Sequence, residues 1–181
     1  EGDGNTVKVG NANPLFSMGW SHTLSYKGVS LYFLIDCRYG GDILSQTQAD
    51  MDMYGVSKTT ADARDDGYIM LEGHRVENVK GFYKNVVGGR AGVTEYYMYD
   101  ATNVRLRELS LNYQLPADWI AKTKVFKDIQ LSFVGRNLFF IYKKAPFDPD
   151  LVLSTGNDNQ GIEVFGMPTT RSLGFTLKCE F

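Results

Sequence analysis

Apolar and polar residues alternate along five segments of the chain, each about ten to twelve residues long. In the last segment Leu173, Phe175, Leu177, Cys179 and Phe181 are apolar, and the residues between them are polar or small. Successive side chains of a strand point to opposite faces, so each segment predicts a strand with one apolar and one polar face. The predicted strands cover about residues 15–26, 29–39, 104–115, 129–142 and 171–181.

Two details of the pattern refine this prediction. The first two strands are separated by Lys27 and Gly28 alone, which predicts a tight hairpin. In the third strand Leu106 is out of phase with Leu109, and one inserted residue near Arg107 would restore the register. We therefore expect a β-bulge at that point.

The strands are long for a soluble protein, in which strands usually have about five or six residues. A tilted strand that spans a membrane needs about 9 to 11 residues. The connections also differ in length: residues 26–29 and 116–128 form the shorter links, whereas about 40–103 and 143–170 form long loops. This asymmetry is typical of outer-membrane barrels. The pattern predicts an all-β fold, an antiparallel meander of five long strands that forms part of a transmembrane β-barrel with extracellular long loops.

The charges and aromatic residues fit the same interpretation. Asp36, Arg38, Arg136 and Lys178 all fall on the polar face, which would face the barrel lumen. A Lys or Arg facing lipid would cost roughly 2 to 4 kcal/mol at the midplane. Aromatic residues gather near the strand ends, as expected of the two interfacial girdles: Tyr26, Tyr113 and Phe181 at the short-turn side, and Phe16, Tyr39 and Phe139 or Phe140 at the long-loop side.

Composition excludes several classes of protein. The formal net charge is -2 and the sequence has no basic run, so it does not indicate a nucleic-acid-binding protein. No run approaches the roughly 18 apolar residues of a membrane-spanning helix. The polar, glycine-rich start of the chain has neither the charged region nor the apolar region of a signal peptide. Cys37 and Cys179 lie on the second and fifth predicted strands, with two strands between them, so we expect no disulfide between them.

The residues do not indicate an enzyme, a cofactor or a metal site. The loop after Gly41 contains several aspartates that could ligate calcium, but their spacing lacks the 12-residue calcium-loop pattern, and a solvated loop is the preferred interpretation. His22 and His74 lie on different elements, without a ligand or catalytic partner at suitable spacing. The aspartates concerned are Asp42, Asp50, Asp52, Asp62, Asp65 and Asp66.

Tyrosines are concentrated in the same long loop. Tyr54, Tyr68, Tyr83, Tyr96 and Tyr97 would be able to stack on sugar rings of a substrate. The alternative, which we favour, is that they pack a small core within the loop. A soluble β-sandwich that binds carbohydrate also remains open at this point.

Several stretches together resemble the C-terminal end of SusC/RagA-type TonB-linked outer-membrane transporters. They are GNANPLFSMGWSHTLSYKGVSLYFLIDCRYGGDI, YMYDATNVRLRELSLNYQLP, VGRNLFFIY, FDPD and the closing TRSLGFTLKCEF. Their order and spacing cover nearly the whole chain. The resemblance implies that residues 1–181 are the C-terminal segment of a barrel of about 22 strands with a plug in its lumen.

The resemblance also implies a location, partners and a role. The location is the bacterial outer membrane, and the role is TonB-dependent uptake of a nutrient, typically an oligosaccharide or a peptide. The implied partners are the lipid membrane, a SusD-type surface lipoprotein, TonB through an N-terminal part, and the barrel-assembly machinery. That machinery would recognise the last strand through Leu173, Phe175, Leu177, Cys179 and Phe181. Another outer-membrane barrel, such as a siderophore receptor or an autotransporter translocator, is the alternative within this class.

Overall fold

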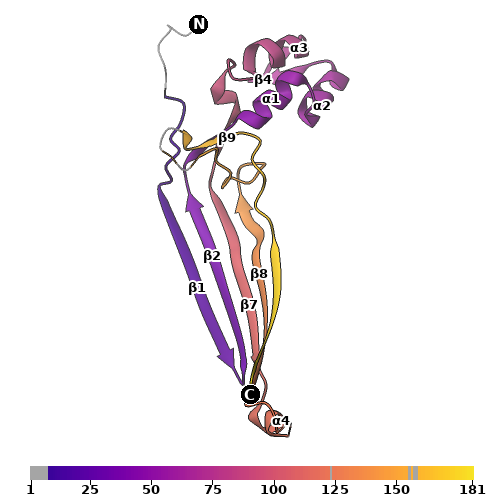
Figure 1. The fold of residues 1–181 in the computed structure, drawn as a ribbon. Helices are drawn as coiled ribbons and strands as arrows, with labels where there is room; N and C mark the ends of the chain where they lie inside the picture. The colour runs from indigo at the N-terminus through magenta and orange to yellow at the C-terminus, as the bar shows by residue number, and fades with distance from the viewer. Residues whose placement is uncertain (1–7, 123, 155, 157–158) are drawn as a thin grey trace. The chain divides into compact units, whose positions relative to one another are not determined.

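The computed structural model describes residues 8–122, 124–154, 156 and 159–181. The chain divides into two compact units (Figure 1). The sheet unit consists of Leu15–Tyr39, Thr102–Pro146 and Thr169–Phe181. The helical unit is formed by the described residues up to Pro14 together with those of Gly40–Ala101 and Phe147–Pro168. We describe each unit by itself.

The sheet unit is built on one sheet of five strands in the order β1-β2-β7-β8-β10. Each strand pairs with its neighbours in an antiparallel manner, which confirms the expected all-β meander. Both long segments leave the sheet at one end, because Asn103 pairs with Arg38 near the end of β2 and with Lys143 at the end of β8. The strands are β1 (Phe16–Tyr26), β2 (Val29–Tyr39), β7 (Asn103–Gln114), β8 (Asp128–Lys143) and β10 (Ser172–Glu180).

The turn between β1 and β2 is the tight hairpin that the sequence predicts. Lys27 and Gly28 both have positive φ, 45° and 83°. Positive φ at both central residues matches the twist of a two-residue hairpin, and glycine adopts it without strain. A Cβ at Gly28 would lie 2.8 Å from the carbonyl oxygen of Gln114. The turn therefore requires glycine there for space as well as for conformation.

The two faces of the sheet differ as the alternation predicts. The register places Phe33, Leu111, Leu131 and Leu177 on one face, as expected. Large apolar side chains on this face are exposed, for example Trp20 at 55% and Phe175 at 69%. In a β-sandwich a second sheet would cover such a face. Among the described residues, no second sheet covers this face.

The expected bulge is present on β7. Opposite β2 the register passes from Leu34 paired with Glu108 to Ile35 paired with Leu106, which leaves Arg107 as the extra residue. The pairing of β7 with β8 shifts at the same place. Asn137 on β8 adopts φ 50° there, a conformation that asparagine tolerates better than most residues. The bulge restores Leu106 to the apolar face.

The two cysteines are far apart in the strand order. Cys37 on β2 and Cys179 on β10 are separated by β7 and β8, and both are free thiols. Cys37 pairs near the long-segment end of β7, whereas Cys179 pairs with Ile129 near the start of β8. The two residues therefore also lie at opposite ends of the sheet.

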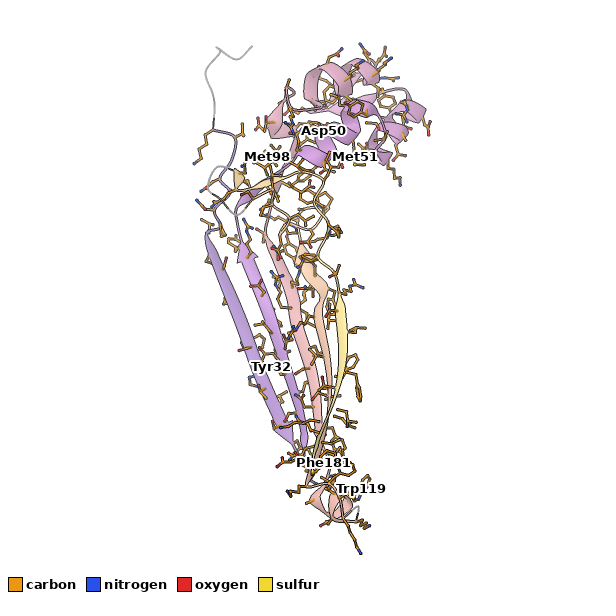
Figure 2. The ribbon with its side chains drawn as sticks, viewed as in Figure 1. Tyr32, Asp50, Met51, Met98, Trp119 and Phe181 are labelled. Atoms are coloured by element: carbon orange, nitrogen blue, oxygen red, sulfur yellow. The ribbon has the colours of Figure 1, made fainter. Side chains whose placement is uncertain are left out.

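The connection between β7 and β8 contains a short helix, α4 (Ala117–Ala121). Its Ile120 is buried, while Trp119 is exposed. Figure 2 labels Trp119 and Phe181, which both lie at the short-turn end of the sheet unit. The ring of Phe181 contacts Phe126, with 5.0 Å between the centroids. Aromatic residues thus gather at this end, as the girdle interpretation expects.

The long segment between β2 and β7 contains helices and short strands. Helix α1 (Gln46–Tyr54) begins at Ser45, whose hydroxyl accepts from Gln48 N, and ends at Gly55 with φ 70°. Helix α2 (Lys58–Asp66) begins in the same way at Ser57. Such caps satisfy backbone groups that the helix itself leaves unpaired. The other elements are β3 (Asp42–Ser45), β4 (Ile69–Leu71), β5 (His74–Val76), α3 (Val79–Gly81), η1 (Phe82–Val87), η2 (Thr94–Tyr97), β6 (Met98–Asp100) and β9 (Ile162–Glu163).

A small hydrophobic core holds the helical unit together. Burial of its side chains is the main stabilising contribution, at about 25 cal/mol per Å² of apolar surface. Three aromatic rings of this core and its border pack edge to face: Phe82 lies 5.3 Å from Tyr83 and 5.6 Å from Tyr96, centroid to centroid. The buried members are Ala49, Ala63, Val79, Phe82, Tyr83, Val87 and Tyr97.

None of the described helices is both long enough and apolar enough to cross a membrane.

Candidate functional site

The charged residues predicted to face a lumen lie on one face of the sheet. By register Asp36 is opposite Arg105, Arg136 is opposite Glu108, and Lys178 is opposite Gln130, all on the polar face that also carries Arg38. Ser, Thr, Asn and Gln side chains occupy most of the uncharged positions on this face. Their orientation toward a lumen remains a prediction.

Ion pairs connect neighbouring strands on the polar face. Arg107, the bulged residue, donates from Nε to Asp36 Oδ2 at 2.9 Å, and its Nη2 lies 2.9 Å from the same oxygen. Arg136 Nε donates to Glu108 Oε2 at 3.2 Å. The bulge therefore turns the Arg107 side chain toward the polar face, where it joins β2 to β7.

Sequence reasoning did not identify Arg105 or Arg107 as part of this polar face. Arg105 is 1% exposed, and its guanidinium lies 3.8 Å from the centroid of the Phe140 ring. A guanidinium over an aromatic face is a favourable arrangement. The signal was present in the alternation of Arg105, Leu106 and Arg107, but its faces become clear only once the bulge is placed.

The apolar face carries an aromatic cluster on β1 and β2. The Trp20 ring meets the Phe33 ring edge to face, with 5.3 Å between the centroids, and the His22 ring lies 5.9 Å from Phe33. His22 therefore falls on the apolar side, as the alternation predicts. At the long-segment end Phe16 stacks on Tyr39 at 5.3 Å.

The candidate assembly residues alternate along one face of β10. Leu173, Phe175 and Leu177 are exposed, and Cys179 is half-buried. Phe181 follows the strand and is 69% exposed. These side chains form a regular apolar row, and their role as an assembly signal remains a prediction.

The loop tyrosines divide into two groups. Tyr83 and Tyr97 are 4% and 2% exposed and belong to the core of the helical unit, as the favoured interpretation expects. Tyr54 is 74% exposed and Tyr96 is also exposed. Tyr68 is half-buried, with Arg75 over its ring at 4.2 Å. A role in stacking on substrate therefore remains a prediction, and only Tyr54, Tyr68 and Tyr96 present accessible rings for it.

Asp52 is the buried centre of a hydrogen-bond network in the helical unit. The Tyr97 hydroxyl donates to its Oδ2 at 3.1 Å, and Gln48 Nε2 donates to its Oδ1 at 2.7 Å. Burial, with a further contribution from Asp52, raises the pKa of Tyr97 far above its ordinary value. Burial also raises the pKa of Tyr83, with smaller effects from Tyr96 and Asp52. Both phenols are therefore neutral in the folded protein.

The acidic residues do not gather into a metal site. Among the described residues, no group of three or more His, Cys, Asp or Glu side chains could hold a metal ion. The buried Glu163 instead accepts hydrogen bonds from Ser45 at 2.9 Å and from Thr47 at 2.6 Å. This carboxylate joins β9 to the beginning of α1.

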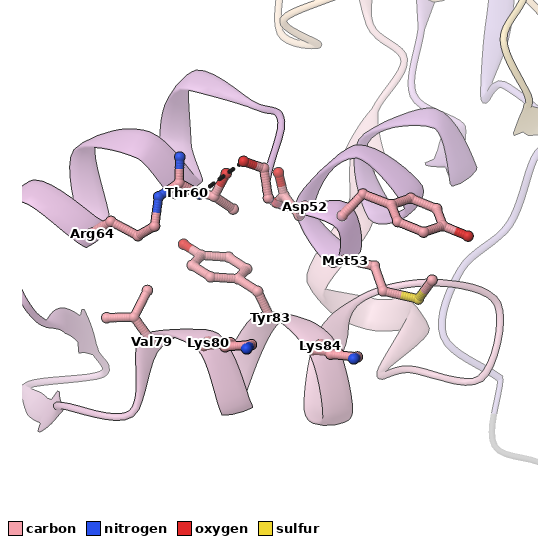
Figure 3. Close-up of a pocket in the computed structure, with 10 residues that line it drawn as sticks. Asp52, Met53, Thr60, Arg64, Val79, Lys80, Tyr83 and Lys84 are labelled. Atoms are coloured by element: carbon pink, nitrogen blue, oxygen red, sulfur yellow. Dashed lines mark hydrogen bonds between the residues drawn. The ribbon is translucent and has the colours of Figure 1, made fainter.

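A pocket of about 240 Å³ lies within the helical unit (Figure 3). Figure 3 shows the Tyr83 ring pointing toward α2, which carries Thr60 and Arg64. Asp52, Thr60, Val79 and Tyr83 are buried, and the remaining lining residues are half-buried or exposed. The full lining is Asp52, Met53, Tyr54, Gly55, Thr60, Arg64, Val79, Lys80, Tyr83 and Lys84.

Comparisons with known proteins agree with the geometry of the sheet. No family model matches the chain. "TonB-dependent receptor P3" of Formosa agariphila is 26% identical over 178 residues, which cover 96% of this chain and 17% of that protein. The RagAB peptide importer in its closed-closed state superposes with a TM-score of 0.65 at 17% identity, over 94% of this chain and 18% of that one. Its open-open state gives a TM-score of 0.58 at 19% identity, and the match covers 94% of this chain and 17% of that one.

The chain has the fold of a SusC/RagA-type barrel segment. The expected resemblance and fold class are therefore confirmed. The chain spans 17% of the length of the curated relative that it matches. A third structure, of the RagAB peptide transporter, agrees with a TM-score of 0.61 at 18% identity, over 94% of this chain and 17% of that one.

Proposed function

We propose that the chain is part of the barrel wall of a TonB-dependent nutrient importer of the bacterial outer membrane. The observation that supports this most is the contrast between the two faces of the sheet. The apolar face is exposed from Trp20 on β1 to Phe175 on β10. Soluble monomers rarely expose an apolar patch larger than a few hundred Å², whereas barrel strands alternate between apolar outside and polar inside.

The polar face fits a lumen wide enough for a hydrated cargo. Arg107 and Asp36 pair across strands, as do Arg136 and Glu108. Paired charges keep the wall polar without presenting a strong field of one sign. We propose that the cargo is an oligosaccharide or a peptide, and that Asp36, Arg38, Arg136 and Lys178 line its path. A structurally similar protein is a peptide importer by name, which is consistent with a bulky cargo.

We further propose that the helical unit lies on the extracellular side of the membrane, where it would contribute to a contact with a SusD-type lipoprotein. Both long segments leave the sheet at one end, and long loops of outer-membrane barrels lie on the extracellular side. Energy would come from TonB through a part of the transporter outside these residues. We expect the segment to have no enzymatic activity.

Uptake by the full-length transporter tests this proposal. Cells that carry the gene as their route for a candidate oligosaccharide or peptide should accumulate the labelled compound, and a strain without TonB should not. The protein should also fractionate with the outer membrane. Uptake that continues unchanged without TonB, or protein recovered in the soluble fraction, would contradict the proposal.

A further inference from the structure

The pocket beside Asp52 in the helical unit has the composition of a small ligand site. Its buried lining residues include a carboxylate, a hydroxyl and a phenol, from Asp52, Thr60 and Tyr83. Apolar contact is available from Val79 and Met53. Sites for small molecules commonly combine apolar walls with a few polar groups in this way. Its volume of about 240 Å³ would accommodate one sugar ring or one amino-acid residue.

Three cations line the same pocket. Arg64 projects from α2, Lys80 from α3 and Lys84 from η1, and all three residues are exposed. Arg64 Nη1 donates to the carbonyl oxygen of Gly55 at 2.8 Å, which holds its guanidinium at the end of α1. A guanidinium has five N–H donors, and this hydrogen bond uses one of them. Three cations against the single carboxylate of Asp52 give the opening a net positive charge.

The buried floor sets a second requirement. Asp52 accepts from Gln48 and Tyr97, and a carboxylate has acceptor sites for about four donors. A ligand group next to Asp52 must therefore donate a hydrogen bond rather than carry a negative charge. The Tyr83 phenol stays protonated, because burial and its neighbours raise its pKa. Its hydroxyl therefore keeps a proton, which a ligand oxygen would share with Tyr96.

We propose that this pocket binds a carboxylate-bearing ligand the size of one residue, with its carboxylate at Arg64, Lys80 and Lys84 and a hydroxyl or N–H donor toward Asp52. Two sources share this chemistry: a uronic acid residue of an oligosaccharide and an acidic residue of a peptide. The site lies within the helical unit alone. The inference therefore stands whether or not the chain belongs to an importer.

Calorimetric titration of the full-length protein in detergent tests the site. The probes are methyl glucuronoside and N-acetyl-glutamate amide, each with its uncharged counterpart, methyl glucoside and N-acetyl-glutamine amide. We expect at least one acidic probe to bind at least about ten-fold more tightly than its neutral counterpart, because a hydrogen bond to a charged group is worth about 1.5 to 3 kcal/mol. The acidic probe that binds identifies the source of the ligand.

Substitutions place the binding in this pocket rather than elsewhere in the protein. The double substitution Lys80→Gln and Lys84→Gln should lower the affinity for the acidic probe about ten-fold, because it removes two of the three cations. Tyr83→Phe keeps the buried ring and removes only the hydroxyl, and should also weaken binding. Lys58→Gln is the matched control, because Lys58 is exposed on α2 but does not line the pocket. An unchanged thermal unfolding transition shows that the variants remain folded.

Three results would overturn the proposal. They are the absence of binding for both acidic probes at millimolar concentration, equal binding of acidic and neutral probes, and equal affinity of the double lysine variant and the Lys58→Gln control.

Discussion

An arginine placed at successive heights on the apolar face of β7 should destabilise the protein according to its depth in the membrane. The strand runs from Asn103 to Gln114. Leu109, Leu111 and Tyr113 therefore lie about 0.5, 2.5 and 4.5 residues from its midpoint. At about 3.3 Å per residue and a tilt of about 40°, these positions are roughly 1, 6 and 11 Å from the midplane.

The apolar band of an outer-membrane barrel is about 25 Å tall, so its edge lies about 12 Å from the midplane. Leu109→Arg should therefore cost about 2 to 4 kcal/mol of unfolding free energy, Leu111→Arg roughly 1 to 2, and Tyr113→Arg about 0 to 1. Asn112→Arg lies on the polar face of the same strand and serves as the control, with an expected cost below that of Leu111→Arg.

Urea titration of the full-length protein in phospholipid vesicles, followed by tryptophan fluorescence, would give these differences. The order matters more than the absolute values, because each variant is compared in the same host. Equal costs at Leu109, Leu111 and Tyr113, or a cost for Asn112→Arg as large as that for Leu109→Arg, would refute the assignment of faces.

Three further predictions concern other parts of the chain. A double-mutant cycle of Asp36→Ala and Arg107→Ala should give a coupling of about 1 kcal/mol, because the pair is about two-thirds buried; a coupling near zero would show that the bulge does not serve to join the strands. Raised pKa values keep Tyr83 and Tyr97 neutral when folded, whereas in an unfolded chain they ionise near pH 10. Their contribution to stability should therefore be complete below about pH 10 and decline above it, as followed by tyrosinate absorbance together with near-ultraviolet circular dichroism; ionisation of both phenols near pH 10 without unfolding would contradict this. Phe181→Ala should lower the amount of transporter in the outer membrane and leave protease-sensitive protein in the periplasm, measured by fractionation, whereas a residue that only closes the aromatic girdle would leave that amount unchanged.

The sheet could be predicted from the sequence because its signal is local. Alternation with period two identifies a strand and assigns its faces without knowledge of the partner strand. The phase slip between Leu106 and Leu109 placed the bulge, since only an inserted residue returns both leucines to one face. The direction of the Arg107 side chain could not be predicted, because it depends on the pairing with Asp36 on another strand.

A small core in this segment was expected, but its helices were not predicted because they lack an apolar stripe. α1 reads QTQADMDMY, and it buries Gln46, Ala49 and Asp52 rather than a run of large apolar residues. Its end signals were nevertheless present, with Ser45 before the helix and Gly55 after it. The pocket could not be predicted at all, because it brings together Arg64 and Lys84 from elements that only the fold places side by side.

The central claim is that the sheet is a membrane wall with lipid on one face and water on the other. Nitroxide labels on β8 test it directly in the full-length protein in lipid bilayers, after Cys37 and Cys179 have been replaced by serine. Labels at Leu131 and Phe133 should collide preferentially with oxygen dissolved in lipid, and labels at Gln130 and Ser132 should collide preferentially with a water-soluble nickel chelate. Equal access of the chelate at all four positions, or protection of Leu131 and Phe133 from both reagents, would contradict the account.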